Sequence, residues 1–342
     1  MKRMLVFILI FGMVLSLGAC TQTGEMTEDA SNSVISGEYY PITVTDQAGR
    51  QVVIEEEPER IVSCYYITSS LLIALGLDEK MVGIEEHPEY RPVYGLSSPE
   101  MLELPWVGTA KVIDLEACAK IAPDLAILPM KVKDSADDLE ALGIKVLLVN
   151  PESQELLAEM ISMVARATNM EVRGKELIAY IGEKEEQLSN ALQGTDTPSV
   201  YLAGNSNFLS TAGNAMYQSD MIRLGGGVNV AAGIEDTYWA EIDYEQLLAW
   251  NPDYIILPSS AKYTVEDILS DPVLTDCKAV TNGDVYQVPG KAEAWDSPVP
   301  GSFLGAYWLA NILHPDLVTE TECMEVMDEY YEIFYDFTYS EN

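Results

Sequence analysis

Short runs of apolar residues alternate with stretches of helical periodicity along most of the chain. Short apolar runs bounded by turn signals are typical of buried strands, whereas apolar residues three and four positions apart are typical of helices. In the first half this pattern predicts strands at residues 61–63, 81–84, 125–128 and 146–149, and helices at 69–77, 113–121, 135–142 and 153–167, after a two-stranded element at 42–54. The alternation indicates a mostly parallel sheet covered by helices.

The same alternation begins again in the second half of the chain. It predicts strands at 199–203, 254–257 and 285–288, a helix at 303–313 and a helical tail from Glu320 onward. Between the halves, residues 171–193 keep apolar residues at helical spacing and place charged residues on the other faces. The predicted fold class is therefore α/β, with two Rossmann-like lobes that have mostly parallel sheets and are joined by a single long α-helix.

A short internal match supports two related lobes. Residues 114–129 align with residues 243–258 after a shift of 129 positions, and seven of the 16 aligned positions are identical. In each copy a carboxylate near the start of a predicted helix favours the positive helix end, and Pro-Asp follows the helix. Glu116 and Glu245 occupy equivalent places in the two copies. Taken alone, this equivalence is equally consistent with helix capping.

The N-terminus has the layout of a cleaved signal peptide. Lys2 and Arg3 precede an apolar stretch that ends in Leu17-Gly18-Ala19-Cys20. The stretch is shorter than the ~20 residues that cross a bilayer. The motif resembles a bacterial lipobox, which implies that Cys20 carries a lipid anchor; an ordinary secretory signal is the alternative. The expected organisation is a signal peptide at 1–19, a polar tether at 20–38, a first lobe at 39–168, a connecting helix at 169–195 and a second lobe at 196–342.

The chain is strongly acidic, with 55 Asp and Glu against 19 Lys and Arg and a net charge of −36. Nucleic acid is therefore not an expected partner, and a lipid rather than surface charge would hold the protein at a membrane. Four further cysteines, Cys64, Cys118, Cys277 and Cys323, lack any CxxC pair, so no zinc site is indicated. They lie in strand and helix patterns, where buried thiols are expected although disulfides are permitted outside the cell.

From about Tyr39 onward the chain resembles the periplasmic-binding-protein family that serves ferric siderophore, haem and vitamin B12 importers. The resemblance is carried, in order, by segments 58–63, 74–77 with 82–83, 107–108, 123–125, 142–146, 225–229, 245–247 with 251–253, and 282–286. It implies a lipid-anchored, monomeric receptor on the extracellular face of the cell membrane or in the periplasm. It also implies that Glu116 and Glu245 dock on arginines of an ABC transporter permease. Ser70 departs from the pattern, since many relatives carry a glutamate there.

The resemblance places the ligand between the lobes, at the carboxyl ends of the strands. The loops expected there are rich in aromatic residues and carry a few lysines, which suits an iron chelate, haem or cobalamin. Trp239 is the strongest single candidate, because its place before the Glu245 helix matches a cleft tryptophan of B12-binding relatives. The full set of expected ligand contacts is Tyr65, Tyr66, Thr68, Lys111, Lys131, Asn207, Trp239, Lys291, Trp295 and Asp296.

Other functions remain as alternatives. The loop at 293–302 also resembles relatives reported to take up oxyanions such as molybdate, so a molybdate or tungstate receptor is a second hypothesis. A tetrapyrrole chelatase has a similar bilobed shape and is a distant third. No catalytic residue, metal ligand or cofactor is expected: there are two histidines, His87 and His314, and no GxSxG or phosphate-loop motif. A surface module without a transporter would not require glutamates at matched positions.

Overall fold

The computed structural model describes residues 39–234 and 239–342. The predicted signal peptide, Cys20 and the tether lie outside these described residues. Within the described ranges, no helix combines the length and the apolarity needed to cross a bilayer.

The first lobe is built on a parallel four-stranded sheet in the order β4-β3-β7-β8. All five residues of its central strand β7 are buried, as expected for a parallel strand that is covered on both faces. An antiparallel hairpin, β1–β2, comes before the sheet, and β5 (Gly108–Thr109) pairs with β6 (Val112–Ile113) beside it. The main elements are β1 (Ile42–Thr45), β2 (Gln51–Ile54), β3 (Ile61–Ser63), α1 (Tyr66–Ala74), β4 (Met81–Gly83), α2 (Pro92–Ser97), α3 (Leu115–Ile121), β7 (Leu125–Pro129), α4 (Ala136–Ala141), β8 (Lys145–Val149) and α5 (Gln154–Ala167).

The second lobe repeats this plan with a parallel sheet in the order β11-β9-β13-β14. A separate antiparallel pair, β10–β12, carries Trp239. The elements are β9 (Ser199–Leu202), β10 (Ser210–Ala212), α7 (Tyr217–Leu224), β11 (Val228–Asn229), β12 (Trp239–Glu241), α8 (Tyr244–Trp250), β13 (Tyr254–Leu257), α9 (Val265–Leu269), α10 (Lys278–Asn282), β14 (Val285–Gln287), α11 (Phe303–Leu313) and α12 (Glu320–Tyr335). The predicted α/β class with two parallel sheets is confirmed.

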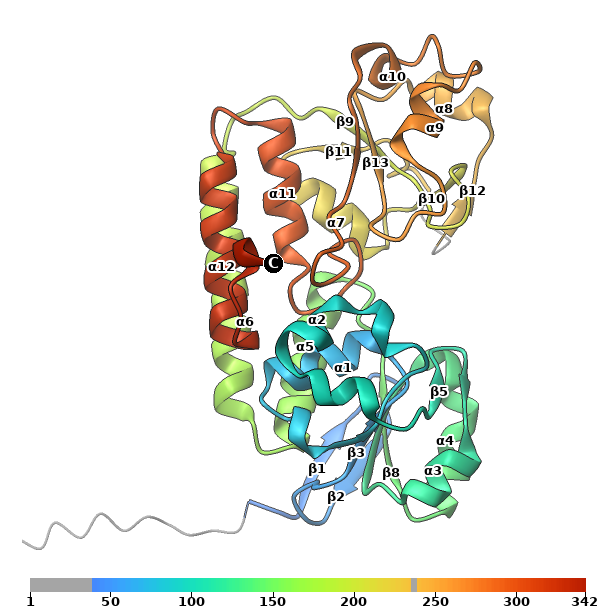
Figure 1. Ribbon diagram of the computed structural model, residues 1–342, viewed down its shortest axis with the longest axis vertical. Helices are drawn as coiled ribbons and strands as arrows, with labels where there is room; N and C mark the ends of the chain where they lie inside the picture. The colour runs from blue at the N-terminus through green and yellow to red at the C-terminus, as the bar shows by residue number, and fades with distance from the viewer. Residues whose placement is uncertain (1–38, 235–238) are drawn as a thin grey trace, which may run out of the picture. The chain divides into compact units, whose positions relative to one another are not determined.

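A 21-residue helix, α6 (Glu171–Ala191), lies between the two sheets in the chain, where the sequence predicts one long helix. At 1.5 Å per residue it is about 30 Å long. It runs beside α12 (Figure 1), where the Lys184 ammonium is 2.6 Å from a Glu329 carboxylate oxygen. Gly174 allows α6 to pack closely on α5, because a Cβ at this position would lie 2.5 Å from the Cβ of Ala165.

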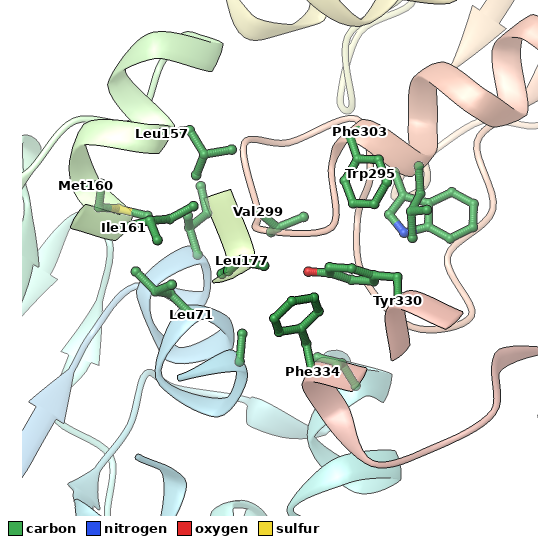
Figure 2. Packing of buried hydrophobic residues seen from close by; sticks show 14 of the residues in the cluster. Leu71, Leu157, Met160, Ile161, Leu177, Trp295, Val299, Phe303, Tyr330 and Phe334 are labelled. Carbon is green, nitrogen blue, oxygen red and sulfur yellow. The ribbon is translucent and has the colours of Figure 1, made fainter. Parts of the chain in front are cut away.

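The C-terminal helix α12 also reaches back to the first lobe. It packs against α1, and Ser97 at the end of α2 donates a hydrogen bond of 2.7 Å to the carbonyl of Tyr335. Figure 2 shows apolar residues of the first lobe and α6 facing residues of the C-terminal segment across one core. The residues labelled there are Leu71, Leu157, Met160, Ile161, Leu177, Trp295, Val299, Phe303, Tyr330 and Phe334.

The cysteines at positions 64, 118, 277 and 323 are all buried and free. Burial raises the pKa of the Cys64 thiol to about 12 and that of Cys118 to about 11. The prediction of small buried thiols, rather than disulfides, is confirmed.

Candidate functional site

Two cavities are lined by residues of both lobes, among them residues that follow the carboxyl ends of β3, β7, β8, β13 and β14. Each is lined by loops from the two lobes, so a ligand in either would contact both halves of the protein. The larger has a volume of about 310 Å³ and is lined by Tyr65, Ala110, Pro129, Met130, Lys131, Lys133, Val149, Asn150, Pro151, Glu152, Met216 and Trp239. The smaller has a volume of about 100 Å³ and is lined by Tyr66, Ser70, Tyr90, Arg91, Pro92, Val93, Tyr94, Ser259, Ser260, Gly290, Ala292, Glu293, Ala294 and Val299.

The larger cavity brings together three of the predicted contacts, Tyr65, Lys131 and Trp239. Tyr65 follows β3 at the start of α1, Lys131 follows β7, and Trp239 comes from β12 of the second lobe and is 39% exposed. Burial raises the pKa of the Tyr65 phenol well above its ordinary value, so this hydroxyl stays a hydrogen-bond donor. Burial also raises the pKa of the nearby Glu152 carboxyl, against the opposing effect of Lys131. The cavity therefore offers aromatic faces, cations and one carboxyl whose pKa is raised by burial.

The smaller cavity contains Tyr66 and adjoins Asp296. The Asp296 carboxylate is buried and accepts hydrogen bonds from the backbone N–H of Ser259, at 3.1 Å, and from its hydroxyl, at 2.6 Å. Burial raises the pKa of Asp296, whereas these hydrogen bonds lower it. In this structure Asp296 therefore holds the Ser259 loop in place at the edge of the cavity.

Five further predicted contacts do not line either cavity. Thr68 is fully buried within α1, and Trp295 is 1% exposed with its indole N–H donating to the Tyr331 hydroxyl at 2.9 Å. Lys111 is exposed in the β5–β6 turn, next to the lining residue Ala110. Asn207 is exposed and donates to Glu241 at 2.6 Å, and Lys291 is exposed near the C-terminal carbonyl of Asn342. Neither Thr68 nor Trp295 has free side-chain surface for a ligand in this arrangement.

Glu116 and Glu245 have the same local surroundings on the two lobes. Each is the exposed second residue of a seven-residue helix, α3 or α8. The preceding aspartate caps that helix by accepting from a backbone N–H, at 2.9 Å for Asp114 and 2.8 Å for Asp243. Both helices end on a residue in the left-handed conformation, and Pro-Asp follows. The sequence repeat therefore corresponds to a structural repeat that exposes one carboxylate on each lobe.

Three cations that form no salt bridge within the described ranges line a cavity, and three others lie near lining residues in the sequence. The described ranges contain 17 Lys and Arg residues, and eight of them take part in the salt bridges of these ranges. Six of the other nine line a cavity or lie within two residues of a lining residue, namely Arg91, Lys111, Lys131, Lys133, Lys262 and Lys291. Arg91, Lys133, Glu152 and Glu293 are lining residues that sequence reasoning did not single out. The only signal for Arg91 was its place in a loop after a predicted strand.

The Periplasmic binding protein family model matches residues 61–292 of this chain. The molybdate-binding protein MolA of Haemophilus influenzae is 23% identical over 323 residues, which cover 86% of this chain and 91% of that protein. Its structure with molybdate bound has a TM-score of 0.76 and 22% identity, and the match covers 87% of this chain and 98% of that one.

Two other proteins are similar to this chain, one in sequence and one in structure. YvrC of Bacillus subtilis, described as an uncharacterized ABC transporter substrate-binding lipoprotein, is 24% identical over 301 residues, covering 83% of this chain and 88% of that protein. The Ni-His complex of Helicobacter pylori CeuE has a TM-score of 0.77 and 18% identity, covering 88% of this chain and 97% of that one. At these identities the solved structures establish the shared fold.

Proposed function

The chain belongs to the periplasmic binding protein family, and from this premise we propose that it is the receptor of an ABC importer for an anionic metal chelate, such as a ferric siderophore or haem. The receptor binds the chelate between its lobes and delivers it to the permease without chemical change. The observation that supports this ligand class is that Arg91, Lys131 and Lys133, which form no salt bridge within the described ranges, line the two cavities of a chain with a net charge of −36.

Charge favours a chelate that bears carboxylates, catecholates or propionates. An anion is repelled by most of this surface, and a cleft lined by one sign of charge concentrates the oppositely charged ligand locally. Lys131 and Lys133 line the larger cavity without a salt-bridge partner among the described residues. A corrin with amide side chains, as in cobalamin, would gain less from these lysines than an anionic chelate would.

Size and surface also favour a chelate in the larger cavity. Ligand pockets are typically ~300–1,000 Å³ and mostly apolar, with a few placed polar groups; this cavity has a volume of about 310 Å³, at the lower end of that range. Tyr65 and Trp239 present aromatic faces from opposite lobes, and Met130 and Met216 add adaptable apolar contacts. A bare tetrahedral oxyanion would fill only a small part of this space.

An oxyanion such as molybdate is the second candidate. It is favoured by the similarity to molybdate-binding MolA, which extends over 86% of this chain. An oxyanion would also use the unpaired cations, so charge alone does not separate it from a chelate.

Delivery requires an anchor and a docking surface. We assign the anchor to a lipid on Cys20, which lies outside the described residues, and the docking contacts to Glu116 and Glu245. One exposed ion pair contributes little affinity, but two at a fixed separation specify the orientation on the permease. We expect the receptor to act as a monomer.

Binding is tested with residues 39–342 by titration calorimetry and thermal shift, using a ferric tris-catecholate, haemin, cyanocobalamin and molybdate as probes. A ligand at 100 times its Kd stabilises the native state by about 2.7 kcal/mol. We expect the chelates to bind to the wild type. The double variant Lys131→Gln and Lys133→Gln should lower the affinity for them about tenfold or more. Lys120→Gln, on the outer helix α3, is the matched control. Tight binding of cyanocobalamin alone, unchanged in the double variant, would overturn the chelate assignment.

Docking is tested separately by charge reversal of both glutamates in cells that depend on this receptor. Glu116→Lys with Glu245→Lys should abolish uptake and leave the calorimetric affinity for the same ligand unchanged. Normal uptake by the double variant would remove these residues from the docking surface. A lost affinity would instead place them in ligand binding.

A further inference from the structure

Arg91 lies in the wall of the smaller cavity, in the loop between β4 and α2. The centre of its guanidinium is 3.8 Å from the centre of the Tyr66 ring. This contact is a cation–π interaction, which fixes the guanidinium against the ring and leaves N–H groups at its edge. Within residues 39–234 and 239–342, the Arg91 side chain has neither a salt bridge nor a hydrogen bond. A half-buried guanidinium with five donors is thus presented to a cavity between the lobes.

The buried carboxyl groups around Arg91 are already satisfied by other donors. Glu85 accepts hydrogen bonds from Ser69 at 2.7 Å and from Tyr94 at 2.6 Å. Asp296 accepts from Ser259, as described above. Arg91 lowers the pKa of Glu85 and Asp296 only as a secondary effect, after burial and their hydrogen bonds. Because these carboxyl groups have their own partners, the N–H groups of Arg91 remain available to an incoming anion.

The third neighbouring carboxyl, Glu293, also lines the cavity. It accepts from Ser70 on α1 and from Tyr331 and Tyr335 on α12, both at 3.2 Å. Burial raises the pKa of Glu293 to about 7. At or below neutral pH a substantial fraction of this carboxyl is therefore uncharged, and its repulsion of an anion at Arg91 is reduced.

Two consecutive tyrosines line the two cavities, one each. Tyr65 lines the larger cavity and Tyr66 the smaller one, and their rings pack edge to face with centroids 5.6 Å apart. A ligand with its body in the larger cavity and an arm beside Arg91 would therefore contact both tyrosines. A small free anion could occupy the smaller cavity by itself.

We propose that the smaller cavity is a separate oxyanion subsite in which Arg91, held flat against Tyr66, binds a carboxylate or a tetrahedral oxyanion through its N–H edge. The occupant is either a carboxylate arm of the chelate in the larger cavity or a free oxyanion. The inference rests on the proposed function, which it deepens by assigning one anchor residue. Arginine suits this role because its planar fork matches two oxygens of an oxyanion at once.

The test compares Arg91→Gln with the wild type of residues 39–342 by calorimetry. The probes are ferric citrate, which carries carboxylates, a ferric tris-hydroxamate without carboxylates, and molybdate. Arg166→Gln is the matched control, because Arg166 is exposed on α5 and also lacks a salt bridge in the described ranges. Arg91→Lys keeps the charge but not the planar fork, and its melting temperature reports whether the loop still folds.

If the occupant is a carboxylate arm, Arg91→Gln should weaken the binding of ferric citrate about 10- to 100-fold, since hydrogen bonds between charged groups contribute roughly this much. The binding of the tris-hydroxamate should be unaffected. If the occupant is a free oxyanion, Arg91→Gln should weaken the binding of molybdate by the same factor and leave the affinity for both chelates unchanged. Arg91→Lys should recover only part of the loss. Wild-type affinity of Arg91→Gln for both ferric citrate and molybdate would overturn the subsite and leave the proposed function standing. If the wild type bound none of the chelates or molybdate, the proposed function and the subsite would both be wrong.

Discussion

Replacement of the buried carboxyl of Glu293 should change how the stability of the protein depends on pH. Glu293 is 4% exposed and connects α1 to α12 through Ser70, Tyr331 and Tyr335. Burial raises its pKa from 4.5 to about 7, against the opposing effect of these hydrogen bonds. A carboxyl whose pKa is raised on folding stabilises the native state fully below its unfolded pKa, and this contribution is lost as the pH rises through the folded pKa.

The magnitude follows from the size of the shift. One pKa unit corresponds to about 1.4 kcal/mol, so a rise from 4.5 to about 7 gives a loss on the order of 2 to 3 kcal/mol between pH 5 and pH 8. Glu293→Gln keeps the shape of the side chain and removes its titration. The wild type should therefore lose that much more unfolding free energy over this range than the variant does.

The assay is urea denaturation of residues 39–342, followed by tryptophan fluorescence at several pH values from 5 to 8. Burial also raises the pKa of Glu185, to about 6, so the variant should keep part of the pH dependence. Glu245→Gln is the matched control, because this glutamate is exposed on α8 and its replacement should leave the profile unchanged. Parallel wild-type and Glu293→Gln profiles would refute the assignment of a neutral buried carboxyl.

Three further predictions concern packing, thiols and the larger cavity. Gly174→Ala should destabilise the protein by about 1–3 kcal/mol in urea denaturation, because the added methyl would lie 2.5 Å from the Cβ of Ala165. The control is Gly182→Ala, on the same helix but with open space around it. Equal unfolding free energies of the two variants would contradict close packing of α5 on α6. The four buried thiols of residues 39–342 should resist Ellman's reagent in the native state and all react in urea; fast native labelling would contradict their burial. Haemin bound in the larger cavity should quench tryptophan fluorescence. Trp239→Phe should reduce that quenching more than Trp250→Phe, on α8, does. Equal reductions by the two variants would place the ligand elsewhere.

Many of the regular elements could be predicted from the sequence because their signals are local, although α2 and the β10–β12 pair were not predicted. The strand at residues 61–63 and the helix at residues 303–313 were predicted with the bounds that the structure has. The apolar spacing of residues 171–193 gave α6 to within two residues. The helix predicted from Ser69 begins three residues earlier, at Tyr66. Helix starts are marked in a sequence mainly by capping residues. The side chain of Tyr65, the N-cap of α1, makes no capping hydrogen bond, so the start of this helix carries no such mark.

The arrangement within the site depended on contacts between distant residues, which the sequence pattern does not encode. Trp295 was expected to face a ligand, but its indole packs on Tyr339 and donates to Tyr331 of α12, 36 residues further along the chain. Thr68 was expected in the cleft because it follows β3, but it lies on the buried side of α1. Arg91 gave no distinguishing signal, because its proposed role depends on Tyr66, which packs beneath it, and on the lack of a salt-bridge or hydrogen-bond partner among the described residues.

The packing of α12 against α1 has a consequence for the order in which the protein folds. Residues 39–342 form one compact unit by their contacts, and one core cluster includes both Val44 of β1 and Tyr339, near the C-terminus. Domains usually fold as units while the chain is still emerging, the N-terminal one first. Here the core of the first lobe stays incomplete until the 16 residues of α12 are available. For a chain exported from its N-terminus, as proposed here, nearly the whole chain must cross the membrane before the core can close. The core between α1 and α12 therefore closes late, after the residues of α12 have joined the rest of the chain.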